Sequence, residues 1–113
     1  MAKEAFPKRE LLVSKLVEKS RDDELSWEEG TGKDSVFVSF KTSSVTILKG
    51  RAWNNDICYT FVVRDAAGET VDRFDADDLS RVTIGQVSEL YEKAWRQVKE
   101  ADKTIDDILK ELE

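Results

Sequence analysis

The sequence predicts an α+β fold: an antiparallel four- to five-stranded meander sheet flanked by an N-terminal helix and a long C-terminal helix, as a two-layer sandwich. Three observations lead to this prediction. Apolar residues recur at gaps of three and four over residues 7–20 and again over 83–112, which is helical spacing. Between them, short alternating apolar stretches are joined by short turns, which favours antiparallel strands. The 113 residues fit one domain, predicted over residues 1–113.

The first predicted helix covers residues 7–20. Pro7 is a residue type favoured at the first helical position, where its missing N–H would have no partner anyway. The four apolar residues with helical spacing that follow it are Leu12, Val13, Leu16 and Val17. We expect this face to lie on the sheet.

The predicted strands cover residues 25–29, 35–41, 45–49, 57–65 and 69–74. The stretch 57–65 has β-branched and aromatic residues on both faces, which is typical of a central strand. Gly68 fits a turn position that needs a left-handed backbone. Asp75 is a candidate cap for a short helical turn after the last strand.

The long C-terminal helix is predicted over residues 83–112, with Thr83 and Gln86 at capping-box spacing. Thirty residues would extend about 45 Å, whereas a six-residue strand spans about 20 Å. The helix therefore either breaks near residues 101–104 or projects its last turns toward another chain. The last turns carry four apolar residues: Ile105, Ile108, Leu109 and Leu112. We expect these residues to take part in oligomerisation, unless the first helix covers them.

Composition argues against several classes of function. The net charge of −6 disfavours nucleic acid as a partner, because phosphate binding depends on Lys and Arg. One cysteine, Cys58, and no histidine argue against a zinc site or an internal disulfide in the monomer. The acids at 72, 75, 77 and 78 lack the spacing of a calcium-binding loop, so no metal and no cofactor is predicted. No apolar run approaches the ~20 residues of a membrane helix, and the N-terminus has no apolar signal core, so we expect a cytoplasmic protein without a membrane partner.

No set of nucleophile and base is recognisable, so we expect no catalytic residues and no enzyme. The loop after the third predicted strand is a candidate contact surface, since Trp and Arg are enriched in binding hot spots. Its residues are Arg51, Trp53, Asn54 and Asn55. The alternative is that Trp53 folds back and has a structural role.

The sequence thus predicts a small acidic non-catalytic protein-interaction module that binds another protein or itself. It would either form a homodimer or act as an inhibitor or immunity-type partner that presents acids to a basic target. Those acids would be Asp22, Asp23, Glu24, Asp75, Asp77 and Asp78. The alternative function is a small-molecule sensor or carrier. Its apolar pocket between sheet and helix would be lined by Phe37, Phe40, Tyr59, Phe61 and Trp95.

Overall fold

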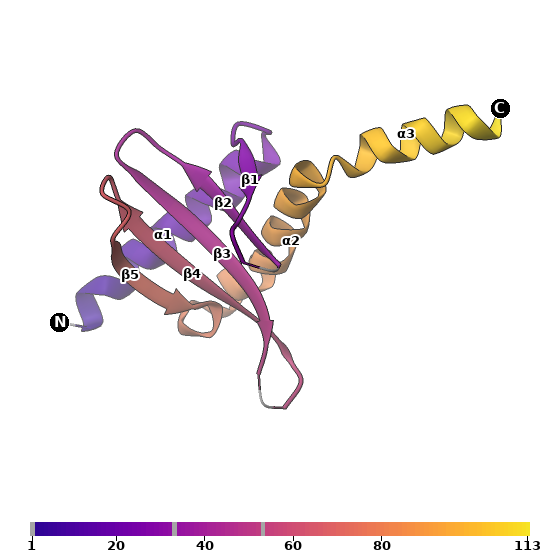
Figure 1. The fold of residues 1–113 in the computed structure, drawn as a ribbon. Coiled ribbons are helices and arrows are strands. Elements are labelled where there is room, and N and C mark those ends of the chain that lie inside the picture. Colours follow the sequence, from indigo (N-terminus) through magenta and orange to yellow (C-terminus); the bar gives the residue numbers. More distant parts are fainter. Residues whose placement is uncertain (1, 33, 53) are drawn as a thin grey trace.

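The computed structural model describes the backbone of residues 2–32, 34–52 and 54–113, and the side chains of these ranges from residue 8 onward. Its elements are shown in Figure 1. A helix, five strands, a short 3₁₀ turn and two helices follow in order: α1 (Ala2–Arg21), β1 (Trp27–Glu29), β2 (Ser35–Ser39), β3 (Ser43–Arg51), β4 (Ile57–Asp65), β5 (Thr70–Asp75), η1 (Ala76–Asp78), α2 (Arg81–Val98) and α3 (Ala101–Leu112). The strands form one antiparallel sheet in the order β1-β2-β3-β4-β5, which confirms the predicted α+β meander.

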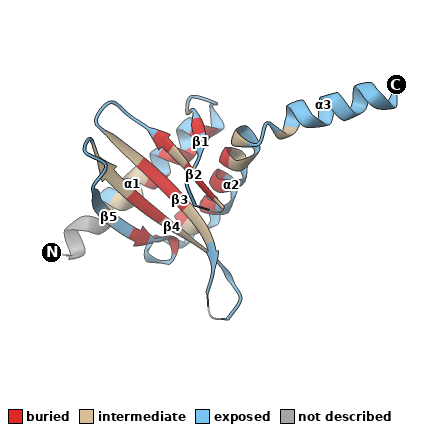
Figure 2. Ribbon diagram, in the orientation of Figure 1, coloured by how far each residue is buried: buried red, intermediate tan, exposed pale blue. Residues whose placement is uncertain are grey.

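The hydrophobic core lies between one face of the sheet and the helices α1 and α2. One cross-strand row of this face contains Val36, Ile47, Phe61 and Phe74, all of them buried. The helices cover this row with apolar residues at helical spacing: Val13, Leu16 and Val17 from α1, and Val87, Leu90, Tyr91 and Ala94 from α2. Figure 2 shows the buried residues in the sheet and along α2.

The opposite face of the sheet, which we call the open face, is not covered by either of the two core helices (Figure 1). Its central row runs from Phe37 on β2 through Thr46 and Val62 to Arg73 on β5. Val62 and Thr46 are buried by their neighbours, whereas Phe37 is partly exposed. Thus β4 carries apolar residues on both faces, as its sequence predicts.

The sheet has a short edge and an irregular edge. At one side β1 has only three residues. At the other side β5 has a register irregularity opposite Val63 and Arg64, and it carries charged residues. Short strands, bulges and charges hinder pairing with a further strand, so these edges are poor sites for strand addition.

Several boundaries differ from the sequence prediction. Helix α1 begins at Ala2 rather than Pro7, since residues 2–6 include good helix formers. Strand β3 extends to Arg51, because its hairpin with β4 continues beyond the rest of the sheet. Helix α2 begins after Ser80 rather than at Thr83: the Ser80 side chain accepts a hydrogen bond from the Thr83 amide, at 3.3 Å. Gly68 has the predicted positive φ, at 84°.

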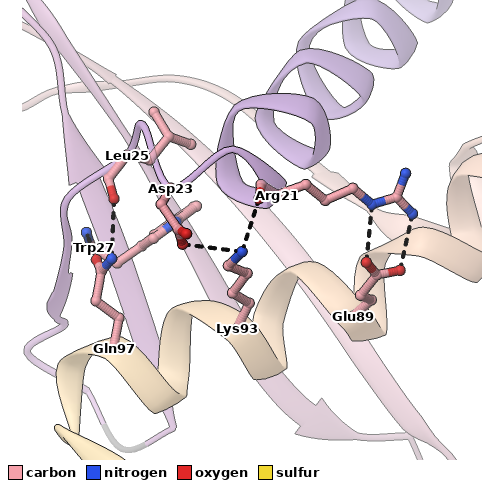
Figure 3. A network of polar contacts seen from close by, with 7 residues as sticks. All are labelled: Arg21, Asp23, Leu25, Trp27, Glu89, Lys93 and Gln97. Atoms are coloured by element: carbon pink, nitrogen blue, oxygen red, sulfur yellow. Dashed lines mark hydrogen bonds and ion pairs between the residues drawn. The ribbon is translucent and has the colours of Figure 1, made fainter. Parts of the chain in front are cut away.

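Polar contacts fix α2 against the N-terminal half of the chain (Figure 3). Arg21 at the end of α1 donates two hydrogen bonds to Glu89, both at 3.0 Å. Lys93, one turn further along α2, donates to the Arg21 carbonyl at 3.1 Å and forms an ion pair with Asp23. At the end of α2, the Gln97 amide donates to the Leu25 carbonyl and accepts from the Trp27 amide.

Candidate functional site

Helix α3 extends away from the sheet and the other helices (Figure 1), and none of its residues is buried. Its apolar side chains share one face and are exposed by 47% at Ile105, 50% at Ile108, 53% at Leu109 and 78% at Leu112. These are the four predicted oligomerisation residues. The structure places them together on one free surface, which we call the α3 stripe.

The break between α2 and α3 lies at Lys99 and Glu100, just before the predicted range of 101–104. Glu100 has φ 50° and ψ 44°, a left-handed conformation that ends α2 and redirects the chain. Thr104 then donates its amide to the Glu100 carbonyl, which starts α3. Because of this turn, the apolar residues after Glu100 do not continue along the sheet.

The alternative that the first helix covers the α3 stripe is wrong. Helix α1 directs its apolar face, including Val13 and Leu16, into the core beside α2. Its polar residues Arg21 and Glu10 contact α2 as well. The apolar face of α1 is therefore already buried, and the α3 stripe stays exposed.

The β3–β4 loop holds the other predicted contact residues. Arg51 and Asn55 are exposed, and the Arg51 guanidinium donates to the Asn55 carbonyl at 2.9 Å. Asn54 accepts from the Asp56 amide at 3.1 Å. These hydrogen bonds give the described part of the loop a defined shape. Trp53 lies outside the described residues.

The open face of the sheet contains a cavity of about 300 Å³. Phe37, Thr46, Leu48 and Arg64 line it, together with the β1–β2 loop. Arg64 donates to the Thr46 hydroxyl at 2.9 Å and is only partly buried. This surface therefore combines apolar side chains with a positive charge, a feature that the sequence reasoning missed because it did not assign a role to the second face.

A second cavity, of about 380 Å³, lies on the helix side of the sheet, where the β3–β4 hairpin passes α2. We call it the Tyr91 cavity. Its charged lining residues are Asp34, Lys49, Arg51 and Glu92, and its aromatic ones are Tyr91 and Trp95. Lys49 Nζ lies 3.7 Å from Glu92 Oε1 and 5.5 Å from the centre of the Tyr91 ring. The sequence analysis named Arg51 as a loop contact residue and Trp95 as a pocket residue, and it did not predict that both line the same cavity.

Tyr91 has a buried hydroxyl that no side chain or backbone group of the described residues satisfies by a hydrogen bond. Its side chain is 2% exposed. Burial raises the pKa of Tyr91 to about 12, with smaller contributions from Asp34, Tyr59 and Glu92. Tyr91 is itself one of the residues that line the Tyr91 cavity, together with Asp34 and Glu92. Its hydroxyl keeps its proton at neutral pH.

The five residues expected to line an apolar pocket do not share one. Phe61 is fully buried in the core, and Phe37 lies on the open face. Phe40 is exposed at the β2–β3 turn. Only Trp95 lines the Tyr91 cavity, while Tyr59 lines a neighbouring one with Ile84.

Some of the acids expected to face a basic target have partners within the chain. Asp23 pairs with Lys93 at 3.1 Å, and Glu24 pairs with Lys19 at 2.9 Å. Asp75 accepts a hydrogen bond from the Thr60 hydroxyl at 2.9 Å. The two ion pairs offset the negative charge that Asp23 and Glu24 would offer to another molecule.

Comparison with protein-family models, with curated proteins and with solved structures finds no match to this chain. Among the described residues, no helix has the length and apolar character needed to span a membrane. The candidate sites therefore rest on their own geometry: the α3 stripe, the open face and the Tyr91 cavity.

Proposed function

We propose that this chain is a self-associating protein-interaction module, in which α3 of one copy covers the open face of the sheet in a second copy. The observation that carries the proposal is the exposed α3 stripe, which the described residues of its own chain leave uncovered. Apolar surface left in water forgoes about 25 cal/mol per Å² that burial would provide. A contiguous exposed apolar surface is typical of an interaction site.

Charge favours the open face over a second α3 as the occupant. Residues 101–113 contain five acids and two lysines. At helical spacing, Asp102 and Glu111 flank the stripe, so two α3 helices placed stripe to stripe would set acids against acids. The open face instead offers Arg64 on β4 and Arg73 on β5.

The dimensions of the two surfaces agree. Helix α3 has 12 residues and is about 18 Å long at 1.5 Å per residue. Five strands spaced about 4.8 Å apart span about 19 Å between the outer strand axes. If each copy covers the other's open face, a two-fold symmetric dimer buries two such contacts, which brings the total area toward the ~1,200 Å² of stable interfaces.

Light scattering across a range of protein concentrations tests the proposal. The parent chain should approach the mass of a dimer, and the double variant Ile108→Glu/Leu112→Glu should stay a monomer. The matched control is Lys103→Gln/Lys110→Gln, which makes the same change of two charge units away from the stripe and should remain a dimer. A parent chain that is monomeric at every concentration contradicts the proposal.

A second pair of substitutions identifies the surface that receives α3. Phe37→Thr/Leu48→Thr removes apolar groups from the open face and keeps residues that favour strands. This variant should be a folded monomer by circular dichroism, and mixing it with the α3 double variant should restore one of the two contacts. If it remains a dimer while the α3 variant is monomeric, α3 pairs with another surface and the open face is not its site.

A further inference from the structure

We infer that the Tyr91 cavity binds a small zwitterionic molecule, with a carboxylate and an ammonium group on a short apolar body. The cavity volume of about 380 Å³ lies within the range of small-ligand sites. It lies on the helix side of the sheet, whereas the proposed assembly uses α3 and the open face. The two proposals therefore rest on different residues.

The charges of the lining support a ligand that carries both signs. Lys49 and Arg51 come from β3, Glu92 comes from α2, and Asp34 precedes β2. The distance of 3.7 Å between Lys49 and Glu92 exceeds hydrogen-bond length, so both groups keep capacity for a ligand. A ligand with one charge would be attracted either by the two cationic or by the two acidic side chains of the lining and repelled by the other two. A zwitterion can place its carboxylate near the cations and its ammonium group near the acids.

The aromatic residues supply the surface for the apolar body. The rings of Tyr91 and Trp95 stack with their centres 5.9 Å apart and an interplanar angle of 16°. Ile57 adds an aliphatic side chain that is 48% exposed at the cavity. The face of an aromatic ring also attracts an ammonium group.

The buried hydroxyl of Tyr91 is the independent observation that points to a ligand. A buried hydroxyl without a partner destabilises a protein, and such groups call for a specific explanation. Because the hydroxyl keeps its proton at neutral pH, it can donate a hydrogen bond to an incoming carboxylate. The nearby cations Lys49 and Arg51 would hold the same carboxylate.

Isothermal titration calorimetry with three probes that share a phenyl ring on a two-carbon chain tests this inference. L-phenylalanine carries both charges, 3-phenylpropionate carries only the carboxylate, and 2-phenylethylamine carries only the ammonium group. L-phenylalanine should bind saturably, at least about tenfold more tightly than either probe with one charge. No saturable binding of L-phenylalanine at about 10 mM, or tighter binding of a singly charged probe, would overturn the inference.

The variant Tyr91→Phe examines the role of the hydroxyl. It should weaken L-phenylalanine binding about five- to tenfold, and it should raise the melting temperature of the free protein because the unsatisfied hydroxyl is gone. The matched control is Tyr59→Phe, the same change at a ring 5.4 Å away that lines the neighbouring cavity. Binding by Tyr91→Phe equal to that of the parent chain would contradict the assignment.

The α3 double variant separates this inference from the proposed function. Ile108→Glu/Leu112→Glu should lose assembly and bind L-phenylalanine as the parent chain does. If binding is absent in both proteins while the parent is a dimer, only the Tyr91 cavity assignment fails. If both bind and the parent is a monomer, only the assembly proposal fails.

Discussion

Glu10 of α1 caps the beginning of α2, and its replacement by glutamine gives a test of how the helices are joined. One carboxylate oxygen accepts the Ser80 amide hydrogen bond. The other accepts from the Thr83 hydroxyl at 2.6 Å and from the Ser80 hydroxyl at 3.2 Å. The negative charge also faces the positive end of the α2 dipole. Glu10→Gln keeps the shape of the side chain and removes the charge.

The expected loss follows from these contacts. A hydrogen bond to a charged group contributes about 1.5–3 kcal/mol in a protected site, and a helix cap about 0.5–2 kcal/mol. Since Glu10 is partly exposed and glutamine can still accept one of the bonds, we expect a loss of about 1 kcal/mol, or roughly 4 °C in melting temperature.

The loss should depend on pH with a defined sign. Burial raises the pKa of Glu10, but hydrogen bonds from Thr83 and Ser80 outweigh it and hold the pKa below its usual value. A lowered pKa in the folded state contributes stability above the unfolded pKa of about 4.3, and this contribution is lost as the pH falls through the folded pKa. The difference between Glu10→Gln and the parent should therefore shrink below about pH 4.

Urea unfolding followed by circular dichroism at pH 7 and pH 3 measures this difference. The control Glu18→Gln makes the same charge change on α1 and should leave stability nearly unchanged, because the Glu18 carboxylate contacts the exposed Lys15 at 3.4 Å and is itself exposed. An equal loss for Glu10→Gln at both pH values would refute the electrostatic reasoning. No loss at pH 7 would refute the capping role.

Three further substitutions have definite expected outcomes, each checked by the unfolding free energy in urea. Gly85→Ala should stabilise by about 0.5–1 kcal/mol, because this exposed position in α2 has no atom within 4 Å of an added methyl group. Gly30→Ala should destabilise by more than 1 kcal/mol, because the methyl group would overlap the buried Ser35 hydroxyl; an unchanged stability would show that this loop adapts. Asp72→Asn should cost about 1 kcal/mol at pH 7, because its two hydrogen bonds with Arg9, at 3.0 and 2.7 Å, hold the pKa of Asp72 low. That last loss should fade as the pH falls below about 4.

The order and type of the elements are predictable from local sequence pattern. Alternation placed β2 and β4 close to their observed bounds, since successive side chains of a strand point to opposite faces. Three-and-four spacing likewise found α1 and one long helical region over residues 83–112, which the structure divides into α2 and α3. Boundaries were less accurate where a helix cap depends on distant residues. Ser80, at the start of α2, is hydrogen-bonded to Glu10, which is 70 residues away in the chain.

The candidate sites also differ in whether local sequence pattern could predict them. The α3 stripe was visible in the sequence because its residues are neighbours on one helix. The Tyr91 cavity was not, because Asp34, Lys49 and Glu92 come from three segments that only the folded sheet and α2 bring together. The Tyr91 hydroxyl has no hydrogen-bond partner among the residues that the structure describes, and this too depends on its surroundings rather than on a local pattern.

By itself, the sequence determined the α+β class, the antiparallel meander and the amphipathic character of the C-terminal region, because these depend on interactions between near neighbours in the chain. Tertiary structure alone decided whether the apolar face of that region is covered. The left-handed backbone at Glu100 directs α3 away from the sheet, and α1 buries its own apolar face beside α2. Whether an apolar side chain is exposed depends on which distant segments pack against it, so its exposure is determined only by the complete tertiary structure.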